Sequence, residues 1–321
     1  MIHNKIIYGD CRQSLKKLHE QNVKVQMCVT SPPYYGLRNY GDESNQIGQE
    51  NTPEEYIQEM VKVFDDVKNI LHDDGVLFLN IGDSYYNYRP GKAYVKQTVS
   101  KTNQDLPTVS PKRSNKLTNY KEKDLIGIPW MLAFALRSAG WYLRQDIIWH
   151  KPNPMPESVK DRCTKSHEYL FLLTKNKRYY FDNESIKEPA KDWGTRNRTN
   201  GKYHNKGTGL SPHSGLTKSY PTKNKRSVWS ITNKPYKGSH FATFPPDLVE
   251  PCILSGSRVS DTILDPFMGS GTSAMVAKSL GRHYIVCELH QHYDKLIWKR
   301  LSTVTVKEPA QATPNPLELL L

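Results

Sequence analysis

The sequence predicts an α/β fold in which a doubly wound, mostly parallel sheet carries two basic insertions. Stretches of strand length alternate with helical patterns along most of the chain. A nearly continuous apolar run at 75–86 is typical of a strand that is buried on both faces. A strand, a glycine-rich loop, a helix and a further strand follow one another at 262–290, which is typical of doubly wound sheets.

The individual elements follow from periodicity and from helix-capping residues. Thr52 suits an N-cap, Pro53 suits the first helical position, and Glu55 completes a capping box. Apolar residues then recur at three- and four-residue spacing, which predicts an amphipathic helix that ends at Gly75. The expected helices are 11–21, 53–74, 129–139, 245–256 and 270–281, and the expected strands are 5–9, 23–29, 75–86, 141–151, 168–175, 261–265 and 283–289.

The positive charge of the chain is concentrated in two segments. The formal net charge is +13, of which residues 92–123 contribute +6 and residues 183–240 contribute +9, so the remainder is slightly negative. Both segments are poor in aliphatic residues, which is also typical of solvated loops. In the second segment, rings interleave with the charges, namely Trp193, Tyr203, Tyr220, Trp229 and Tyr236. This pattern suits phosphate contact and base stacking and favours nucleic acid as the partner.

The glycine-rich loop is compatible with more than one kind of ligand. A P-loop would need lysine before Ser273, but Thr272 occupies that position, so phosphoryl transfer is disfavoured. Gly269, Gly271 and Ala274 do fit a GxGxxA pattern, and Glu288 ends the next strand as a ribose ligand would. A dinucleotide oxidoreductase therefore remains an alternative at this point.

The position of the loop in the chain predicts a permuted order of elements. Only 33 residues follow Glu288, which is too few to supply the remaining strands of the sheet. The N-terminal part offers them, because strand 5–9 leads into Asp10 and strand 23–29 runs into Thr30-Ser-Pro-Pro-Tyr34. The start of the chain is therefore expected to complete the sheet, as in a circular permutation.

The two motifs in this order resemble the β-group of S-adenosylmethionine-dependent DNA amino-methyltransferases. The resemblance rests on Asp265-Pro-Phe-Met-Gly-Ser-Gly-Thr-Ser273 with the upstream Thr30-Ser-Pro-Pro-Tyr34, and it covers about 6–292. It implies a Rossmann-like methyltransferase fold, circularly permuted, whose basic insertions form a target-recognition region. The parts it implies are a catalytic part at 1–182 with a basic insertion at about 88–123, a target-recognition region at 183–240, a cofactor-binding part of the same domain at 241–300, and a tail at 301–321.

Residues 31–34 form a rigid corner that we call the cradle, and the resemblance makes its members Ser31, Pro32, Pro33 and Tyr34 catalytic. An aromatic amine is a poor nucleophile, so it needs acceptors around its N–H bonds that hold it in line for attack. The Ser31 hydroxyl and the Pro32 carbonyl are such acceptors, and the fixed φ of proline keeps the carbonyl in place. The Tyr34 ring offers a face for a base turned out of the duplex.

The resemblance also implies which residues bind the cofactor, S-adenosyl-L-methionine. Glu288 would accept the ribose hydroxyls, and Asp10 would accept from the adenine amino group, although ordinary strand-end acids also occupy such positions. Phe244 would lie beside the methionine part, and it equally suits a core position. The implied cofactor-binding residues are Asp10, Thr30, Phe244, Pro245, Asp265, Phe267, Gly269, Gly271, Thr272 and Glu288.

The expected partner is double-stranded DNA, with a cognate restriction endonuclease that acts separately. The expected DNA-binding residues are Arg38, Lys151, Asn153, Lys223, Lys225 and Arg226, of which Lys151 and Asn153 also suit a merely rigid proline-rich loop. The chain is expected in the cytoplasm at the nucleoid, as a monomer or homodimer, without a membrane segment. The histidines around Cys287 match no class of metal site, so no metal is expected.

The family pattern bears on the target atom, because Ser-Pro-Pro-Tyr is commoner among enzymes that methylate cytosine N4 than among those that methylate adenine N6. The sequence therefore favours a cytosine-N4 DNA methyltransferase over an adenine-N6 enzyme. An NAD-dependent oxidoreductase and a non-catalytic nucleic-acid-binding protein are the further alternatives. The binding protein would explain the basic segments but neither the glycine-rich loop nor the cradle.

Overall fold

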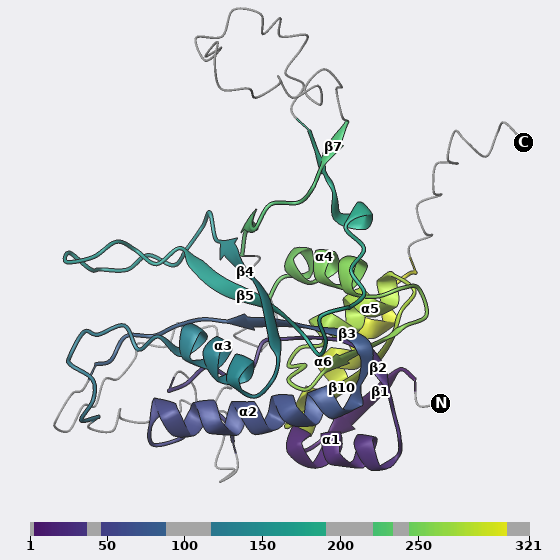
Figure 1. Cartoon of the computed structure of the whole chain (residues 1–321), viewed down its shortest axis with the longest axis horizontal. Coiled ribbons are helices and arrows are strands. Elements are labelled where there is room, and N and C mark those ends of the chain that lie inside the picture. Colours follow the sequence, from purple (N-terminus) through teal and green to yellow (C-terminus); the bar gives the residue numbers. More distant parts are fainter. Residues whose placement is uncertain (1–2, 37–45, 88–116, 191–220, 234–243, 307–321) are drawn as a thin grey trace, which may run out of the picture.

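The computed structural model describes residues 3–36, 46–87, 117–190, 221–233 and 244–306 (Figure 1). The helices are α1 (Cys11–Glu20), α2 (Pro53–Ile70), α3 (Ile128–Ser138), α4 (Pro246–Gly256), α5 (Thr272–Ser279) and α6 (Asp294–Ser302), with short 3-10 turns η1 (Glu184–Ile186) and η4 (Gln291–Tyr293). The strands are β1 (Lys5–Tyr8), β2 (Val25–Thr30), β3 (Leu71–Ile81), β4 (Tyr142–His150), β5 (His167–Thr174), β6 (Glu188–Pro189), β7 (Thr222–Lys223), β8 (Val228–Ser230), β9 (Thr262–Asp265) and β10 (His283–Glu288).

One eight-stranded sheet has the order β1-β10-β9-β2-β3-β5-β4-β8. Its neighbours are parallel except where β5 runs antiparallel to both β3 and β4, so the predicted mostly parallel sheet is confirmed. β1 pairs with β10 and β2 pairs with β9. The N-terminal strands thus complete the sheet beside the C-terminal ones, as the permuted order predicts.

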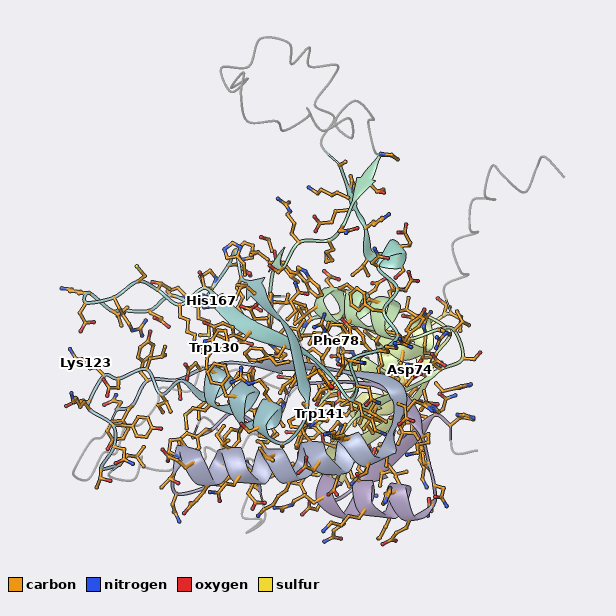
Figure 2. The ribbon with its side chains drawn as sticks, in the orientation of Figure 1. Asp74, Phe78, Lys123, Trp130, Trp141 and His167 are labelled. Carbon is orange, nitrogen blue, oxygen red and sulfur yellow. The ribbon has the colours of Figure 1, made fainter. Side chains whose placement is uncertain are left out.

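Two helical layers cover the two faces of this sheet. Figure 1 shows α1, α2 and α3 on one face and α4, α5 and α6 on the other. Successive residues of β3 enter opposite cores, since Leu77 packs with the first layer and Phe78 packs with the second. In Figure 2, Trp130 and Trp141 lie on the α2 and α3 side of the sheet.

The ends of α2 and α3 are fixed by side chains. The Glu55 amide donates to the Thr52 hydroxyl over 3.1 Å, and the complete capping box confirms the predicted start of α2. The N-cap of α3 is Gly127, which has no side chain, so the Asp83 carboxylate accepts from the Gly127 amide at 3.0 Å instead. At the other end of α3, Lys68 Nζ donates to the Gly140 carbonyl over 2.9 Å.

The predicted boundary between α2 and the next strand is wrong. The helix ends at Ile70, and Leu71 already has extended backbone, so Gly75 lies inside β3 and does not end a helix. A Cβ on Gly75 would lie 2.9 Å from the Gln26 carbonyl oxygen. Close approach of neighbouring backbone therefore explains this glycine.

Several described elements were not expected from the sequence, namely the short strands β6, β7 and β8, the 3-10 turns η1 and η4, and α6. β8 is a three-residue edge strand inside the second basic segment and pairs with β4, and α6 follows β10. Trp229 on β8 is 5 % exposed and its indole N–H donates to the Arg226 carbonyl over 2.7 Å, so the prediction that this ring stacks on bases is wrong. The rings expected to interleave with charge at 193, 203, 220 and 236 lie outside the described residues, and the boundaries of the target-recognition region stay a prediction.

Candidate active site

The two sequence motifs meet at the carboxyl ends of two central strands of the sheet, β2 and β9. β2 and β9 are parallel neighbours, with Cys28 opposite Leu264, so the residues after both strands emerge side by side. Ligands of doubly wound sheets bind at the carboxyl ends of the strands. The cradle after β2 and the glycine-rich loop after β9 are therefore parts of one site.

Asp265 joins the two motifs from a fully buried position. Its carboxylate accepts from the Thr30 hydroxyl at 2.6 Å, from the Ser273 hydroxyl at 2.5 Å and from the Phe267 amide at 3.0 Å. Burial raises the pKa of Asp265 to about 6, while these three donors act in the opposite direction. Thr30 and Asp265 therefore hold the end of β2 against the loop after β9 through buried hydrogen bonds. Direct contact of either residue with a cofactor stays a prediction.

The glycine-rich loop combines left-handed backbone at two glycines with an unpartnered hydroxyl. Gly269 and Gly271 have φ of 54° and 83°, a region that favours glycine, and Gly271 is the N-cap of α5. The Thr272 hydroxyl is buried and finds no hydrogen-bond partner among the described residues. Arg300 from α6 donates to the Ser270 hydroxyl over 2.7 Å and fixes the outside of the loop. The loop thus offers a fixed donor to a ligand.

Glu288 ends β10 next to this loop. It is 7 % exposed, and its carboxylate accepts from the His290 amide at 3.0 Å. Burial raises the pKa of Glu288 to about 7, with backbone donors opposing that effect. A nearly buried carboxylate with remaining acceptor capacity suits a ligand that brings hydroxyl donors.

The two buried carboxylates predict how stability changes with pH. Both pKa values are raised in the folded state, from 3.8 for Asp265 and from 4.5 for Glu288, so folding takes up protons between pH 4 and 7. Their contribution to the free energy of unfolding is fully present below pH 4 and is lost as the pH rises to 7, by about 1.4 kcal/mol per group for each pH unit between its two pKa values.

Urea unfolding between pH 4.5 and 7.5 measures this contribution. Glu288→Gln is expected to make the stability less dependent on pH than that of the wild type, because the neutral amide does not titrate. Asp73→Asn is the matched control, since Asp73 is an exposed acid at the other end of the sheet. An identical pH dependence in wild type and Glu288→Gln would contradict the raised pKa.

Asp10 lies at the end of β1 but already has partners. It is the N-cap of α1, accepts from the Arg12 amide at 2.9 Å, and forms an ion pair with the Arg12 guanidinium at 2.7 Å. Arg12 therefore already occupies part of the Asp10 carboxylate, which the resemblance predicts to accept a hydrogen bond from the adenine amino group. The adenine contact stays a prediction and needs a further lone pair of this carboxylate.

The cradle is held by side chains from several elements. Pro32 is buried, and the Pro33 carbonyl accepts from the Tyr56 hydroxyl of α2 at 2.8 Å. The Tyr34 ring is half-buried and covers Gly82, where a Cβ would lie 2.6 Å from the ring. The Tyr34 hydroxyl donates to Glu168 over 2.7 Å. These contacts fix the corner, and the stacking role of its ring stays a prediction.

The structure places the expected DNA-binding residues in different surroundings. Lys151 is an ion-pair partner of Glu168 and has a side chain only 16 % exposed. The Asn153 side chain donates to the Asn233 carbonyl over 3.0 Å and ties its loop to the chain after β8. Arg38 lies outside the described residues.

Lys223, Lys225 and Arg226 surround a single carboxylate, that of Glu188, with nitrogen–oxygen distances of 4.0, 3.4 and 3.6 Å. Arg226 is 74 % exposed and Lys225 is 22 % exposed, so the arginine is the member best placed for an external anion.

Phe244 and Pro245 are both buried. Phe244 belongs to the core beneath α4, α5 and α6, so core packing accounts for it, and its cofactor contact stays a prediction. Within the described residues, no group of three or more His, Cys, Asp or Glu side chains is arranged to hold a metal ion. In the same part of the chain, no helix has the length and apolar character that crossing a membrane requires.

Sequence reasoning missed Glu168, Asn80 and Tyr56, which all contact the cradle. Glu168 is a charged residue near the start of a strand that is mostly apolar after it, and this was the available signal. Asn80 and Tyr56 lie within apolar patterns of β3 and α2, where nothing local distinguishes a contact to the cradle from ordinary packing.

The fold and the site together define a doubly wound enzyme fold with a rigid acceptor corner beside a glycine-rich ligand loop. Solved structures share this fold. The cytosine-N4-specific PvuII DNA methyltransferase matches with a TM-score of 0.60 and 16% identity over 94% of this chain and 86% of its own. The M1.HpyAVI–SAM complex matches with a TM-score of 0.53 and 18% identity over 92% of this chain and 99% of its own.

The chain belongs to the DNA methylase family, whose model matches residues 25–299. It is 44% identical to the type II methyltransferase M.SmaI of Serratia marcescens, over 92% of this chain and 90% of that protein. It is 42% identical to M.XycI of Xanthomonas campestris pv. cyanopsidis, over 91% and 86% of the two chains. The resemblance stated from the motifs is thereby confirmed at the level of DNA amino-methyltransferases.

Proposed function

We propose that this protein transfers a methyl group from S-adenosyl-L-methionine to the exocyclic N4 amino group of cytosine in double-stranded DNA. The observation that carries the proposal is the Thr30–Asp265 hydrogen bond of 2.6 Å, which ties the cradle to the glycine-rich loop across 235 positions of sequence. A methyl donor and an acceptor base must meet within one site, and this bond joins the two halves of such a site.

The residues around the glycine-rich loop fit S-adenosylmethionine. The unpartnered Thr272 hydroxyl suits a carboxylate or another acceptor of the ligand, and Glu288 suits a pair of ribose hydroxyls. When bound, S-adenosylmethionine supplies a methyl group activated by a positively charged sulfur.

The cradle acts on the amino group of the base. The Ser31 hydroxyl oxygen and the Pro32 carbonyl oxygen accept hydrogen bonds from its two N–H groups. These contacts favour a pyramidal nitrogen whose lone pair faces the methyl carbon. The transfer would form a nitrogen–carbon bond at the expense of the carbon–sulfur bond of S-adenosylmethionine, and the surplus proton of the methylated amino group would pass to water. Cytosine is preferred on the Ser-Pro-Pro-Tyr pattern.

Purified protein, double-stranded DNA and S-adenosylmethionine labelled in its methyl group test this function. We expect label in the DNA and saturable binding of S-adenosylmethionine. Unlabelled DNA with DNA binding intact would indicate a non-catalytic binding protein. Tighter binding of NAD than of S-adenosylmethionine would indicate an oxidoreductase.

The basic residues near β7 and β8 predict a salt effect on DNA binding. Replacing Lys223, Lys225 and Arg226 together with alanine should weaken binding and reduce the slope of log K against log salt by about 1 to 3, because each phosphate contact contributes about 0.9. A salt titration of affinity measures this slope. Lys62→Ala is the control, since Lys62 lies on α2 and is 67 % exposed. An unchanged slope in the triple variant would show that Lys223, Lys225 and Arg226 form ion pairs with Glu188 but do not contact DNA phosphates.

A further inference from the structure

A hydrogen-bonded cluster adjoins Tyr34 of the cradle, and its other members, Glu168, Lys151 and Asn80, have no part in the chemistry described so far. The Tyr34 hydroxyl donates to Glu168 Oε2 over 2.7 Å, and the other oxygen of Glu168 accepts from Lys151 Nζ. The Asn80 amide donates to the Tyr169 carbonyl over 3.1 Å and to Glu168 over 3.4 Å. The cluster therefore joins β3, β4 and β5 to the residue that ends the cradle.

The Glu168–Lys151 pair is withdrawn from solvent. Each side chain is 16 % exposed, and Lys151 Nζ also lies 4.2 Å from the centre of the Trp149 ring. A buried ion pair contributes little net stability, because removing two charges from water offsets most of their attraction. Fixing the position of the Glu168 carboxylate therefore accounts better for this ion pair than a contribution to the free energy of unfolding does.

The Tyr34 hydroxyl has one proton, which fixes the direction of its hydrogen bonds. The 2.7 Å contact to a carboxylate is shorter than the 3.3 Å contact to the Asn80 carbonyl oxygen, so the proton goes to Glu168. Burial and the neighbouring Glu168 charge raise the pKa of Tyr34 well above its ordinary value, so the phenol keeps the proton that it donates to Glu168.

We propose that Glu168, held by Lys151, is a positioning residue that acts through the Tyr34 hydroxyl to orient the cradle for methyl transfer. The carboxylate holds the hydroxyl end of Tyr34, and Lys151 holds the carboxylate. The ion pair thus fixes the ring that closes the cradle over Gly82. This inference rests on the proposed methyl transfer.

The test compares Tyr34→Phe, Glu168→Gln and the double variant in single-turnover transfer of labelled methyl to DNA. Tyr34→Phe is expected to slow transfer about 10- to 100-fold, the range for one hydrogen bond to a charged group, and Glu168→Gln by less, because the glutamine oxygen still accepts from the hydroxyl but without a charge. The double variant should be no slower than Tyr34→Phe, because without the hydroxyl the side chain at position 168 has nothing to hold. Affinity for S-adenosylmethionine should stay within about twofold of the wild type, as the cluster lies outside the loop.

Lys175→Gln is the matched control. Lys175 forms a 2.9 Å ion pair with Asp73 at the opposite end of β5, so its loss changes an ion pair of the same sheet away from the cradle. Its transfer rate should equal that of the wild type.

Thermal melting checks the folding of each variant. If Glu168→Gln alone does not fold because Lys151 loses its partner, Glu168→Gln combined with Lys151→Met removes the unpaired charge and is compared in the same cycle.

Two results would overturn the inference. Multiplicative losses in the double variant would show that Glu168 acts independently of the Tyr34 hydroxyl. Wild-type transfer by Tyr34→Phe, which removes the donor itself, would show that the contact is not used. A wild-type protein that labels no DNA would overturn the proposed function itself, which separates the two failures.

Discussion

Tyr34→Ala is expected to slow methyl transfer by at least about 100-fold while affinity for S-adenosylmethionine stays near that of the wild type. Stacking on an aromatic ring contributes about 1–3 kcal/mol per base, and misalignment of the amino group adds to this loss. The ring also covers Gly82, so its removal opens the cradle on one side. Single-turnover transfer and calorimetry on the same preparations measure the two quantities.

Tyr142→Ala is the control for this change, because Tyr142 is a 45 % exposed tyrosine at the start of β4. Its transfer rate should be that of the wild type. Equal rates of methyl transfer in Tyr34→Ala and Tyr142→Ala would show that the cradle has a structural role and does not act on the base. Ser31→Ala should lower the rate of transfer more than the affinity for DNA, and Ser31→Asp should retain part of the rate, since a carboxylate also accepts.

Asp265→Ala is expected to have the largest effect on the cofactor side of the site. It leaves the Thr30 hydroxyl, the Ser273 hydroxyl and the Phe267 amide buried without their acceptor, and each such group costs about 1–3 kcal/mol. The variant should therefore lose several kcal/mol of stability and bind S-adenosylmethionine much more weakly, because the loop and the cradle come apart.

Glu288→Ala separates binding from stability. It should weaken binding of S-adenosylmethionine strongly and cost less stability than Asp265→Ala, since Glu288 accepts from the His290 amide next to it in the chain and does not join distant segments as Asp265 does. Urea unfolding and calorimetry of both variants check the contrast. An Asp265→Ala protein as stable as the wild type would contradict the role given to this carboxylate.

Local signals in the sequence were sufficient for most of the fold. The capping box of Thr52 and Glu55 lies within four residues, and the apolar run of β3 shows a strand buried on both faces without any other part of the chain. The α2–β3 boundary was misplaced because Gly75 was taken for a helix end, whereas the approach of the Gln26 backbone explains it.

Contacts between residues far apart in the sequence could not be predicted from local sequence patterns. Asp265 was found as part of a motif, but its bond with Thr30 depends on the pairing of β2 with β9. Glu168 was missed because a glutamate at the start of a strand is ordinary until Tyr34 and Lys151 are brought to it. Trp229 was taken for a surface ring because β8 is only three residues long.

Nucleoside analysis by mass spectrometry tests the central claim most directly. DNA is taken from cells that express the wild-type protein, from cells that express Tyr34→Ala, and from cells without either. We expect N4-methylcytosine in the first sample alone. N6-methyladenine in its place would contradict the assigned base, and the absence of any new methylated base from an expressed, folded protein would contradict methyl transfer to DNA.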